Sequence, residues 1–160
     1  EIPGEIQVKG DNVFLGYYKN EEATNAVFTE DGWFCTGDMG ILDQDGSLFI
    51  KGRTKCMILG PSGQNIYPEE VETVLNSQPY VVDSLVIEDN GGLTALIYPD
   101  FPQGARDGMK QEEFVKYLEG TLTELNKELP NYAKLKKIEV MSEDFERTPK
   151  KSIKRYLYQR

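Results

Sequence analysis

The sequence has 160 residues, with 18 lysine and arginine residues against 27 aspartates and glutamates, a net charge of −9 and no histidine. Without an imidazole it contains no Ser-His-Asp triad, no Cys-His catalytic pair and no histidine-bearing zinc site. The acidic charge argues against nucleic-acid binding, because affinity for a phosphate backbone requires clustered lysine and arginine. The hydrophobic content of 39% is typical of a globular protein that buries a core.

Cysteine content and hydropathy limit the compartment and the partners. Cys35 and Cys56 are too few for a disulfide framework or a four-ligand metal site, so we expect no metal site, free thiols and a cytoplasmic location. No apolar run approaches the roughly 18 residues that span a bilayer, and no signal-peptide pattern is present, so no transmembrane segment is expected. The chain begins at Glu1 in an extended pattern, and we expect a piece of a longer protein.

Short strands dominate the first third of the sequence. Apolar and polar residues alternate from Gly4 to Gly10, which predicts a half-buried strand. The apolar pairs around Asp43-Gln44-Asp45-Gly46 predict a hairpin, in which Asp and Gly supply the turn. This Asp-x-Asp-Gly sequence lacks the remaining ligands of a calcium loop, so we interpret it as a plain turn.

After Gly52-Arg53 the predicted strands alternate with helices. Pro68-Glu69-Glu70 predicts the start of a helix, because proline suits the first helical position and carboxylates suit the positive end of the dipole. The segments Val81–Ile87 and Leu93–Tyr98 flank the turn Asn90-Gly91-Gly92. They predict a pair of antiparallel strands.

Helical spacing of apolar residues extends from about Lys110 to Leu129, and Pro130 marks its end. Residues Lys137 to Val140 predict one more strand, and a polar, basic tail follows from Glu146 to Arg160. These patterns divide the chain into a β-rich part, 1–54, and an α+β part, 55–160.

Two clusters carry candidate chemistry. Asp38 follows Thr36-Gly37 at the end of a short aromatic strand, where a carboxylate can accept two hydrogen bonds from the vicinal hydroxyls of a ribose. Arg53 offers a guanidinium fork to phosphate or ribose oxygens, and the turn from Gly60 to Gly63 lets a ligand approach the backbone closely. Each cluster taken alone is also consistent with an ordinary turn or hairpin loop.

Taken in order, these segments resemble the adenylate-forming superfamily of acyl-CoA synthetases, nonribosomal-peptide adenylation domains and luciferases. The resemblance runs through the segments Gly4–Gly10, Gly16–Thr24, Phe28–Trp33, Thr36–Asp38, Gly52–Arg53 and Asn65–Glu72. It implies an α+β fold in which a β-rich remnant of the large N-terminal domain, 1–54, precedes the small, mobile C-terminal α+β domain, 55–160.

The resemblance also implies roles for individual residues. Asp38, with Thr36 beside it, matches the aspartate that binds the ribose hydroxyls of ATP and of the acyl-adenylate, and Arg53 matches a nucleotide-contacting arginine. Lys55 matches the hinge on which the C-terminal domain turns between the two half-reactions. Gly60, Pro61, Ser62 and Gly63 match the loop that lines the pantetheine tunnel during thioester formation.

The basic tail departs from the family pattern. Family members carry a lysine three residues after a proline, and its ammonium neutralises charge during adenylation. In this sequence that slot is Ser152. We expect Lys151 to serve through a one-residue shift, with Lys154 as the alternative. A solvated tail whose catalytic lysine has diverged or been lost remains a further interpretation.

The resemblance implies an ATP-dependent acyl-CoA synthetase, expected to act on long-chain fatty acids with ATP, Mg²⁺ and coenzyme A. The long-chain expectation depends on residues 65–72 and on the tail, 148–155. The expected partners are the small-molecule substrates and an N-terminal adenylation domain of the same chain, and the 160 residues alone are expected to be inactive. The alternatives are an adenylating ligase that loads acyl or aryl groups onto a carrier protein, and a non-catalytic stand-alone module.

Overall fold

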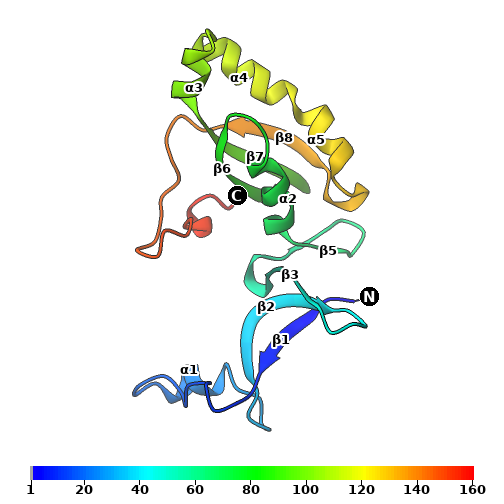
Figure 1. Ribbon diagram of the computed structural model, residues 1–160, viewed down its shortest axis with the longest axis vertical. Coiled ribbons are helices and arrows are strands. Elements are labelled where there is room, and N and C mark those ends of the chain that lie inside the picture. Colours follow the sequence, from blue (N-terminus) through cyan, green and yellow to red (C-terminus); the bar gives the residue numbers. More distant parts are fainter. Residues whose placement is uncertain (1) are drawn as a thin grey trace. The chain divides into compact units, whose positions relative to one another are not determined.

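The computed structural model describes residues 2–160 (Figure 1), and the chain divides into two compact units between Met57 and Ile58. This junction lies close to the division that the sequence predicts at 54 and 55, which stays a prediction about the domains. No helix within residues 2–160 is both long and apolar enough to cross a membrane.

The first unit is built on a three-stranded antiparallel sheet in the order β1-β2-β3. Its elements are β1 (Gly4–Val8), α1 (Glu21–Asn25), β2 (Phe34–Leu42), β3 (Leu48–Arg53) and the 3₁₀ helix η1 (Thr54–Cys56). The predicted first strand and hairpin are therefore confirmed. Asp45 Oδ1 accepts a hydrogen bond from the backbone nitrogen of Ser47 at 2.9 Å, and Gly46 adopts a φ of +87°, which explains why the turn requires these residue types.

The first unit buries few apolar side chains. Phe14 contacts Phe28 and Phe34 with ring centroids 5.5 and 5.1 Å apart, but Phe14 itself is 39% exposed. Strand β3 leaves Phe49 53% and Ile50 70% exposed. Among the described residues, the buried hydrophobic core begins only at Ile66, in the second unit.

The second unit packs helices against a mixed sheet. Its elements are β4 (Ile58–Leu59), β5 (Asn65–Ile66), α2 (Pro68–Asn76), β6 (Val81–Asp89), β7 (Gly92–Pro99), α3 (Phe101–Arg106), α4 (Gln111–Gly120), α5 (Leu122–Glu128), η2 (Asn131–Ala133), β8 (Leu135–Val140) and η3 (Arg155–Leu157). Strand β7 lies between β6, to which it is antiparallel, and β8, to which it is parallel. The predicted hairpin of residues 81–98 and the predicted strand at 137–140 are confirmed.

The two faces of this sheet have different covers. Helices α2 and α5 pack on one face, where Val71, Leu75 and Leu125 meet Val86 and Ala95 of the sheet. The opposite face is covered by the C-terminal segment, 141–160, which returns across the strands (Figure 1). The sequence predicts the helical cover, but it gives the segment only as a basic tail.

The predicted helix from Lys110 to Leu129 is wrong in one respect, because the structure divides it into α4 and α5. Gly120 has low helix propensity. The hydroxyl of Thr121 donates to the carbonyl oxygen of Leu118 at 2.6 Å, and the Thr121 backbone nitrogen donates to the same oxygen. These bonds tighten the last turn of α4 and end the helix there.

Two ion pairs surround Glu139 on β8. Its carboxylate accepts hydrogen bonds from both terminal nitrogens of Arg160, at 3.0 and 2.8 Å, and from Lys137 Nζ at 2.8 Å. Hydrogen bonds from Arg160, followed by those from Lys137, lower the pKa of Glu139 to about 2. The carboxylate therefore stays ionised far into the acid range.

We predict that Arg160→Gln lowers stability at neutral pH and not in strong acid. A carboxyl whose pKa is lowered on folding stabilises the fold above its ordinary pKa, and this contribution is lost as the pH falls toward 2. Since the arginine is half-exposed, we expect a loss of about 0.5–1 kcal/mol at pH 7. Urea unfolding at pH 7 and pH 2 measures it, with Glu124→Gln as a surface ion-pair control. An equal loss at both pH values would contradict the prediction.

Candidate functional site

The predicted nucleotide-binding residues lie together on two neighbouring strands of the first unit. Asp38 on β2 faces Arg53 on β3 in the antiparallel register, and Arg53 Nε lies 2.9 Å from Asp38 Oδ1. Thr36 Oγ1 donates to the carbonyl oxygen of Ile6 at 2.9 Å and accepts from the Asp38 backbone nitrogen at 3.1 Å. The threonine thus fixes the backbone that presents the aspartate, and the arginine fixes its carboxylate.

This pair leaves hydrogen-bonding capacity for a ligand. A carboxylate has about four acceptor sites and a guanidinium has five donors, so a single contact between them occupies a small part of either group. The Asp38 side chain is 33% exposed and that of Arg53 is 62% exposed. The arrangement can accept hydrogen bonds from two neighbouring hydroxyls and donate to a phosphate.

The predicted hinge residue and the predicted tunnel loop follow directly. Lys55 lies in the 3₁₀ helix η1, and the chain leaves that helix in extended conformation at Met57. The loop of Gly60, Pro61, Ser62 and Gly63 joins β4 to β5. The backbone nitrogen of Gly60 donates to the Gln64 carbonyl and that of Gly63 donates to the Gly60 carbonyl, both at 2.8 Å. Gly63 has a φ of +80°, which explains the glycine at that position.

A cavity of about 380 Å³ lies beside this loop, entirely within the second unit. Its polar lining includes Ser62 from the loop, Lys134 and Lys136 from around the start of β8, and Glu88 from β6. The ring of Tyr132 adds an aromatic wall. The cavity therefore combines two amines, one carboxylate and a ring face.

The sequence predicts Ser62 as a residue of the tunnel loop, but it assigns no role to Glu88, Tyr132, Lys134 or Lys136 of the cavity lining. At the level of sequence, lysine and arginine count only as a total against the acidic residues, so Lys134, Lys136 and Lys137 receive no role. The useful signal is their position beside the strand that pairs with β7, close to the Asn90-Gly91-Gly92 turn. Lys136 Nζ lies 3.3 and 3.2 Å from the carbonyl oxygens of Asn90 and Gly91, so its side chain folds over that turn.

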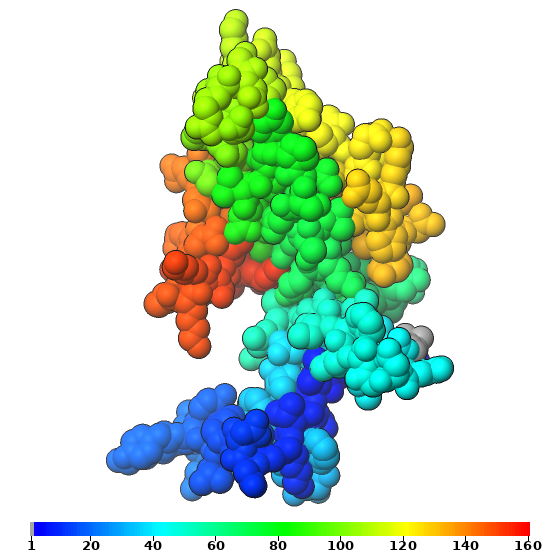
Figure 2. Space-filling view, in the orientation of Figure 1, coloured from blue at the N-terminus to red at the C-terminus, as the bar shows by residue number. Residues whose placement is uncertain are grey.

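The candidate catalytic lysines lie on a hairpin within the C-terminal segment. Arg147 and Ile153 form an antiparallel bridge, and the Thr148 backbone nitrogen donates to the Ser152 carbonyl at 2.8 Å. Lys151 lies in the exposed turn between them with a φ of +65°. In Figure 2 the orange-red part of the chain near residue 150 projects from the unit.

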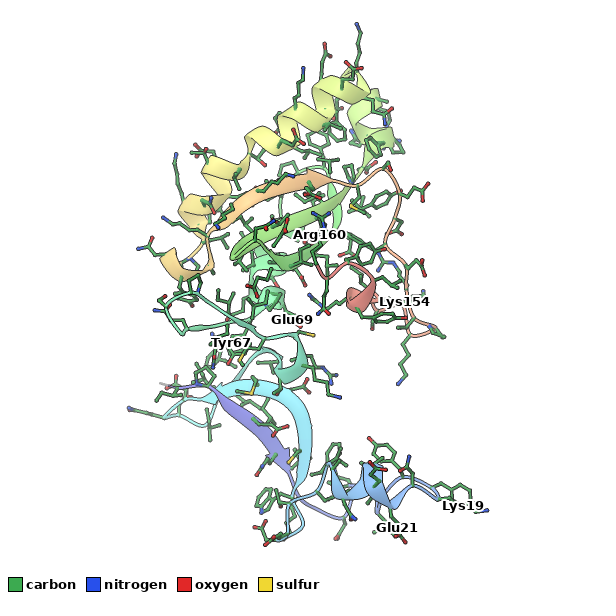
Figure 3. All side chains as sticks on the ribbon, turned by 180° about the vertical axis from the view of Figure 1, so that it is seen from behind. Lys19, Glu21, Tyr67, Glu69, Lys154 and Arg160 are labelled. Atoms are coloured by element: carbon green, nitrogen blue, oxygen red, sulfur yellow. The ribbon has the colours of Figure 1, made fainter. Side chains whose placement is uncertain are left out.

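Lys154 lies at the base of the hairpin, next to η3 (Figure 3). Its Nζ forms an ion pair with Glu146 Oε2 at 3.1 Å, and that hydrogen bond raises the pKa of Lys154. The backbone nitrogen of Lys154 also donates to the carbonyl oxygen of Glu146 at 2.8 Å. This lysine thus joins the two arms of the hairpin.

Comparison with known proteins identifies the second unit. Residues 56–160 match the family described as the C-terminal domain of AMP-binding enzymes. Long-chain-fatty-acid–CoA ligase FadD15 of Mycobacterium tuberculosis is 41% identical over 108 residues, 68% of this chain and 18% of the ligase. Probable 4-coumarate–CoA ligase 2 of Dictyostelium discoideum is 50% identical over 101 residues, 63% of this chain and 17% of the ligase.

A solved structure covers both units. O-succinylbenzoate coenzyme A synthetase from Bacillus subtilis, in complex with ATP and magnesium ion, is similar with a TM-score of 0.77 and 34% identity. The alignment covers 97% of this chain and 30% of the synthetase. The chain therefore spans less than a third of each of these three relatives.

Proposed function

The chain belongs to the family of AMP-binding enzyme C-terminal domains, and we propose that it forms the C-terminal part of an ATP-dependent acid–CoA ligase. The match of residues 56–160 to that family carries the proposal. The named relatives are ligases of the same reaction class, which supports it. On this proposal the division at residues 54 and 55 separates the end of a large adenylation domain from a mobile C-terminal domain.

The first unit supports the proposal because its sheet lacks a core of its own. Strand β3 exposes three consecutive apolar residues, Leu48, Phe49 and Ile50. Such a surface needs a cover, since burying each of these side chains contributes about 1.5–3 kcal/mol. We propose that the remainder of a large adenylation domain provides this cover.

The proposed reaction has two steps. A substrate carboxylate oxygen attacks the α-phosphorus of ATP, forming acyl-AMP and releasing pyrophosphate. The CoA thiol, after losing its proton, then attacks the acyl carbonyl, forming the thioester and releasing AMP. Mg²⁺ would enter with the ATP phosphates, since the described residues contain no cluster of three or more acidic or thiol ligands that could hold it. No step is therefore assigned to the ion through this chain.

In this reaction Asp38 accepts hydrogen bonds from the two ribose hydroxyls, and Arg53 holds the aspartate and donates to the nucleotide. Thr36 sets the backbone of Asp38. The 2.9 Å pair between Arg53 and Asp38 and the exposed acceptor sites of the carboxylate support these roles. The acceptor sites that Arg53 leaves open on the carboxylate can take both hydroxyl hydrogen bonds.

Lys151 supplies positive charge to the transition state of adenylation. The support is its exposure at the hairpin turn, in contrast with the tether of Lys154 to Glu146. An ammonium placed beside the α-phosphate and the attacking carboxylate stabilises the charge that develops between them. Lys154 then acts as a strut for the hairpin.

Thioester formation uses the junction of the units and the cavity. Lys55, in the 3₁₀ helix η1, is the hinge at which the C-terminal domain turns. The loop from Gly60 to Gly63 lines the path of the pantetheine chain. Lys134 and Lys136 hold the phosphates of CoA in the adjoining cavity, and the ring of Tyr132 lies against the nucleotide base of CoA.

We propose a long-chain fatty acid as the substrate, supported by the 41% identity to FadD15 over 108 residues. An aryl acid is the second candidate, because the relative at 50% identity is named as a probable 4-coumarate–CoA ligase. We propose a cytoplasmic location, because two cysteines in 160 residues are too few for the disulfide framework of a small secreted domain.

The first test of the proposed function concerns the reaction itself. The full-length protein that contains this chain should release AMP when supplied with ATP, Mg²⁺, CoA and palmitate. Parallel reactions with 4-coumarate, with benzoate, and with holo carrier protein in place of CoA separate the alternatives. AMP release with carrier protein and none with CoA would contradict the CoA-ligase proposal, and a preference for 4-coumarate would reassign the acid.

The second prediction distinguishes the lysines. Lys151→Ala should slow acyl-adenylate formation about 10²–10³-fold, because it removes one group that stabilises transition-state charge. Pyrophosphate exchange measures this step, and CoA transfer from supplied acyl-AMP should remain at the wild-type rate. Lys154→Ala, which removes only the contact with Glu146, should slow this step less than Lys151→Ala does. A greater loss with Lys154→Ala than with Lys151→Ala would assign the catalytic role to Lys154.

The third prediction concerns the cavity. Replacing Lys134 and Lys136 together by Glu should raise the KM for CoA about tenfold or more, because charge-assisted contacts with phosphate become repulsive. Pyrophosphate exchange should not change, since CoA takes no part in adenylation. Lys127→Glu, on α5 outside the cavity lining, is the control. An unchanged KM for CoA in the double variant would show that the phosphates bind elsewhere.

A further inference from the structure

One guanidinium of the C-terminal hairpin pairs with a strand of the sheet and also reaches the lysine turn. Arg147 Nη2 lies 2.7 Å from Asp83 Oδ2 on β6, and Arg147 Nη1 donates to the carbonyl oxygen of Lys151 at 3.3 Å. Asp144, within the segment itself, provides a second carboxylate at 3.0 Å from Nη2. One planar group thus connects a strand of the core to the residue that carries the proposed catalytic amine.

The position of Asp83 follows from the pattern of β6. Side chains of a strand alternate between faces, so Asp83 lies on the same face as Leu85 and Ile87. That face is covered by the C-terminal segment, in which Phe145 is 3% exposed. The aspartate therefore lies at the edge of an apolar contact. Its side chain is 22% exposed, and that of Arg147 is 31% exposed.

The backbone of the turn at Lys151 is strained, and the contact with Arg147 helps to hold it. The Lys151 backbone nitrogen donates to the Thr148 carbonyl at 2.8 Å, and the Lys151 backbone has a φ of +65°. A lysine in this conformation is strained relative to glycine, so the surrounding contacts must hold it. The hydrogen bond from the Arg147 guanidinium to the Lys151 carbonyl oxygen is one such contact. The same guanidinium is anchored to the sheet through Asp83.

We propose that Arg147 and Asp83 form a positioning pair that holds Lys151 in place for adenylation, an inference that rests on the proposed function. The pair touches no substrate and acts through the Lys151 backbone. Loss of either charge leaves the apolar cover in place and releases the turn. A displacement of about 1 Å at a reacting group can cost about 10²-fold in rate, so the effect should appear in the step that uses the lysine.

A second pair joins η3, which follows the hairpin, to α2. Arg155 pairs with Glu72 on α2, and Glu72 also accepts a hydrogen bond from the Val86 backbone nitrogen at 2.7 Å. Burial raises the pKa of Glu72, and the arginine opposes that rise. This buried pair supports the fold of the segment, so its loss should affect stability. Arg147 is thus the better probe of position.

The test uses the full-length protein and three variants. Asp83→Asn keeps the size of the side chain and removes its charge. Arg147→Lys keeps the charge, but a lysine cannot bridge the Asp83 carboxylate and the Lys151 carbonyl oxygen. Arg160→Gln removes a tail arginine of the same kind that pairs outside the hairpin, and it is the matched control. Each variant is measured for pyrophosphate exchange, for CoA transfer from supplied acyl-AMP, and for its unfolding temperature.

We expect Asp83→Asn and Arg147→Lys to slow pyrophosphate exchange about 10- to 100-fold through kcat, with CoA transfer at the wild-type rate. The control should change neither. Equal losses in both half-reactions would overturn the inference, since they indicate damage to the fold. An unchanged exchange rate in both variants would overturn it as well.

A double-mutant cycle tests whether the pair acts through Lys151. In the Lys151→Ala background, Asp83→Asn should cause no further loss of exchange. A further loss as large as in the wild-type background would show that the aspartate acts elsewhere, and would overturn the inference.

Hydrogen exchange of the amides in 148–152 is independent of the reaction. It should be faster in Asp83→Asn than in the wild type and unchanged in Arg160→Gln. If the wild-type protein adenylates no acid, the proposed function fails. The amide exchange alone then supports or overturns the role of Arg147 and Asp83 as a positioning pair. Unchanged amide exchange in Asp83→Asn would overturn it.

Discussion

The central strand β7 is buried on both faces, and this constraint shapes the second unit. Residues 93–97 are all buried, so successive side chains require apolar cover on opposite sides of the sheet. Helices α2 and α5 provide it on one side. A three-stranded sheet with helices on one face only would leave Leu85, Ile87 and Leu96 in water. The C-terminal segment is therefore part of the core, through Phe145, and not an appendage.

A segment that must cover a sheet can also present a catalytic group at a fixed place. The cover is apolar and non-directional, so it fixes where the segment lies but not the conformation of its turn. Directional contacts fix the conformation of the turn. The ion pairs of Arg147, Lys154 and Arg155 connect the hairpin to β6, to its own first arm and to α2. Hydrophobic burial and charge pairing thus have separate functions in the same twenty residues.

The elements with local signals could be predicted from the sequence. Pro68 with two carboxylates gives the start of α2, and Asn90-Gly91-Gly92 gives the β6–β7 turn, because both depend on residues adjacent in the chain. The break at Gly120-Thr121 could not be predicted, because helical spacing continues through it. The cavity lysines could not be predicted either, because Lys134 and Ser62 come to line one cavity only after folding. The pairing of Asp38 with Arg53 depends on β-strand register, which the motif spacing alone does not specify.

The distribution of charge reconciles a net charge of −9 with the anionic substrates that we propose. Several acidic residues lie beside the tail cations: Asp83, Glu72, Glu139 and Glu146 each pair with a lysine or arginine of the segment. These carboxylates hold the cations in position and neutralise them. Lys151, in its exposed turn, and Lys134 and Lys136, in the cavity, are placed where a phosphate could approach. Net charge therefore excludes a general polyanion surface, whereas local placement of single amines suits small phosphorylated ligands.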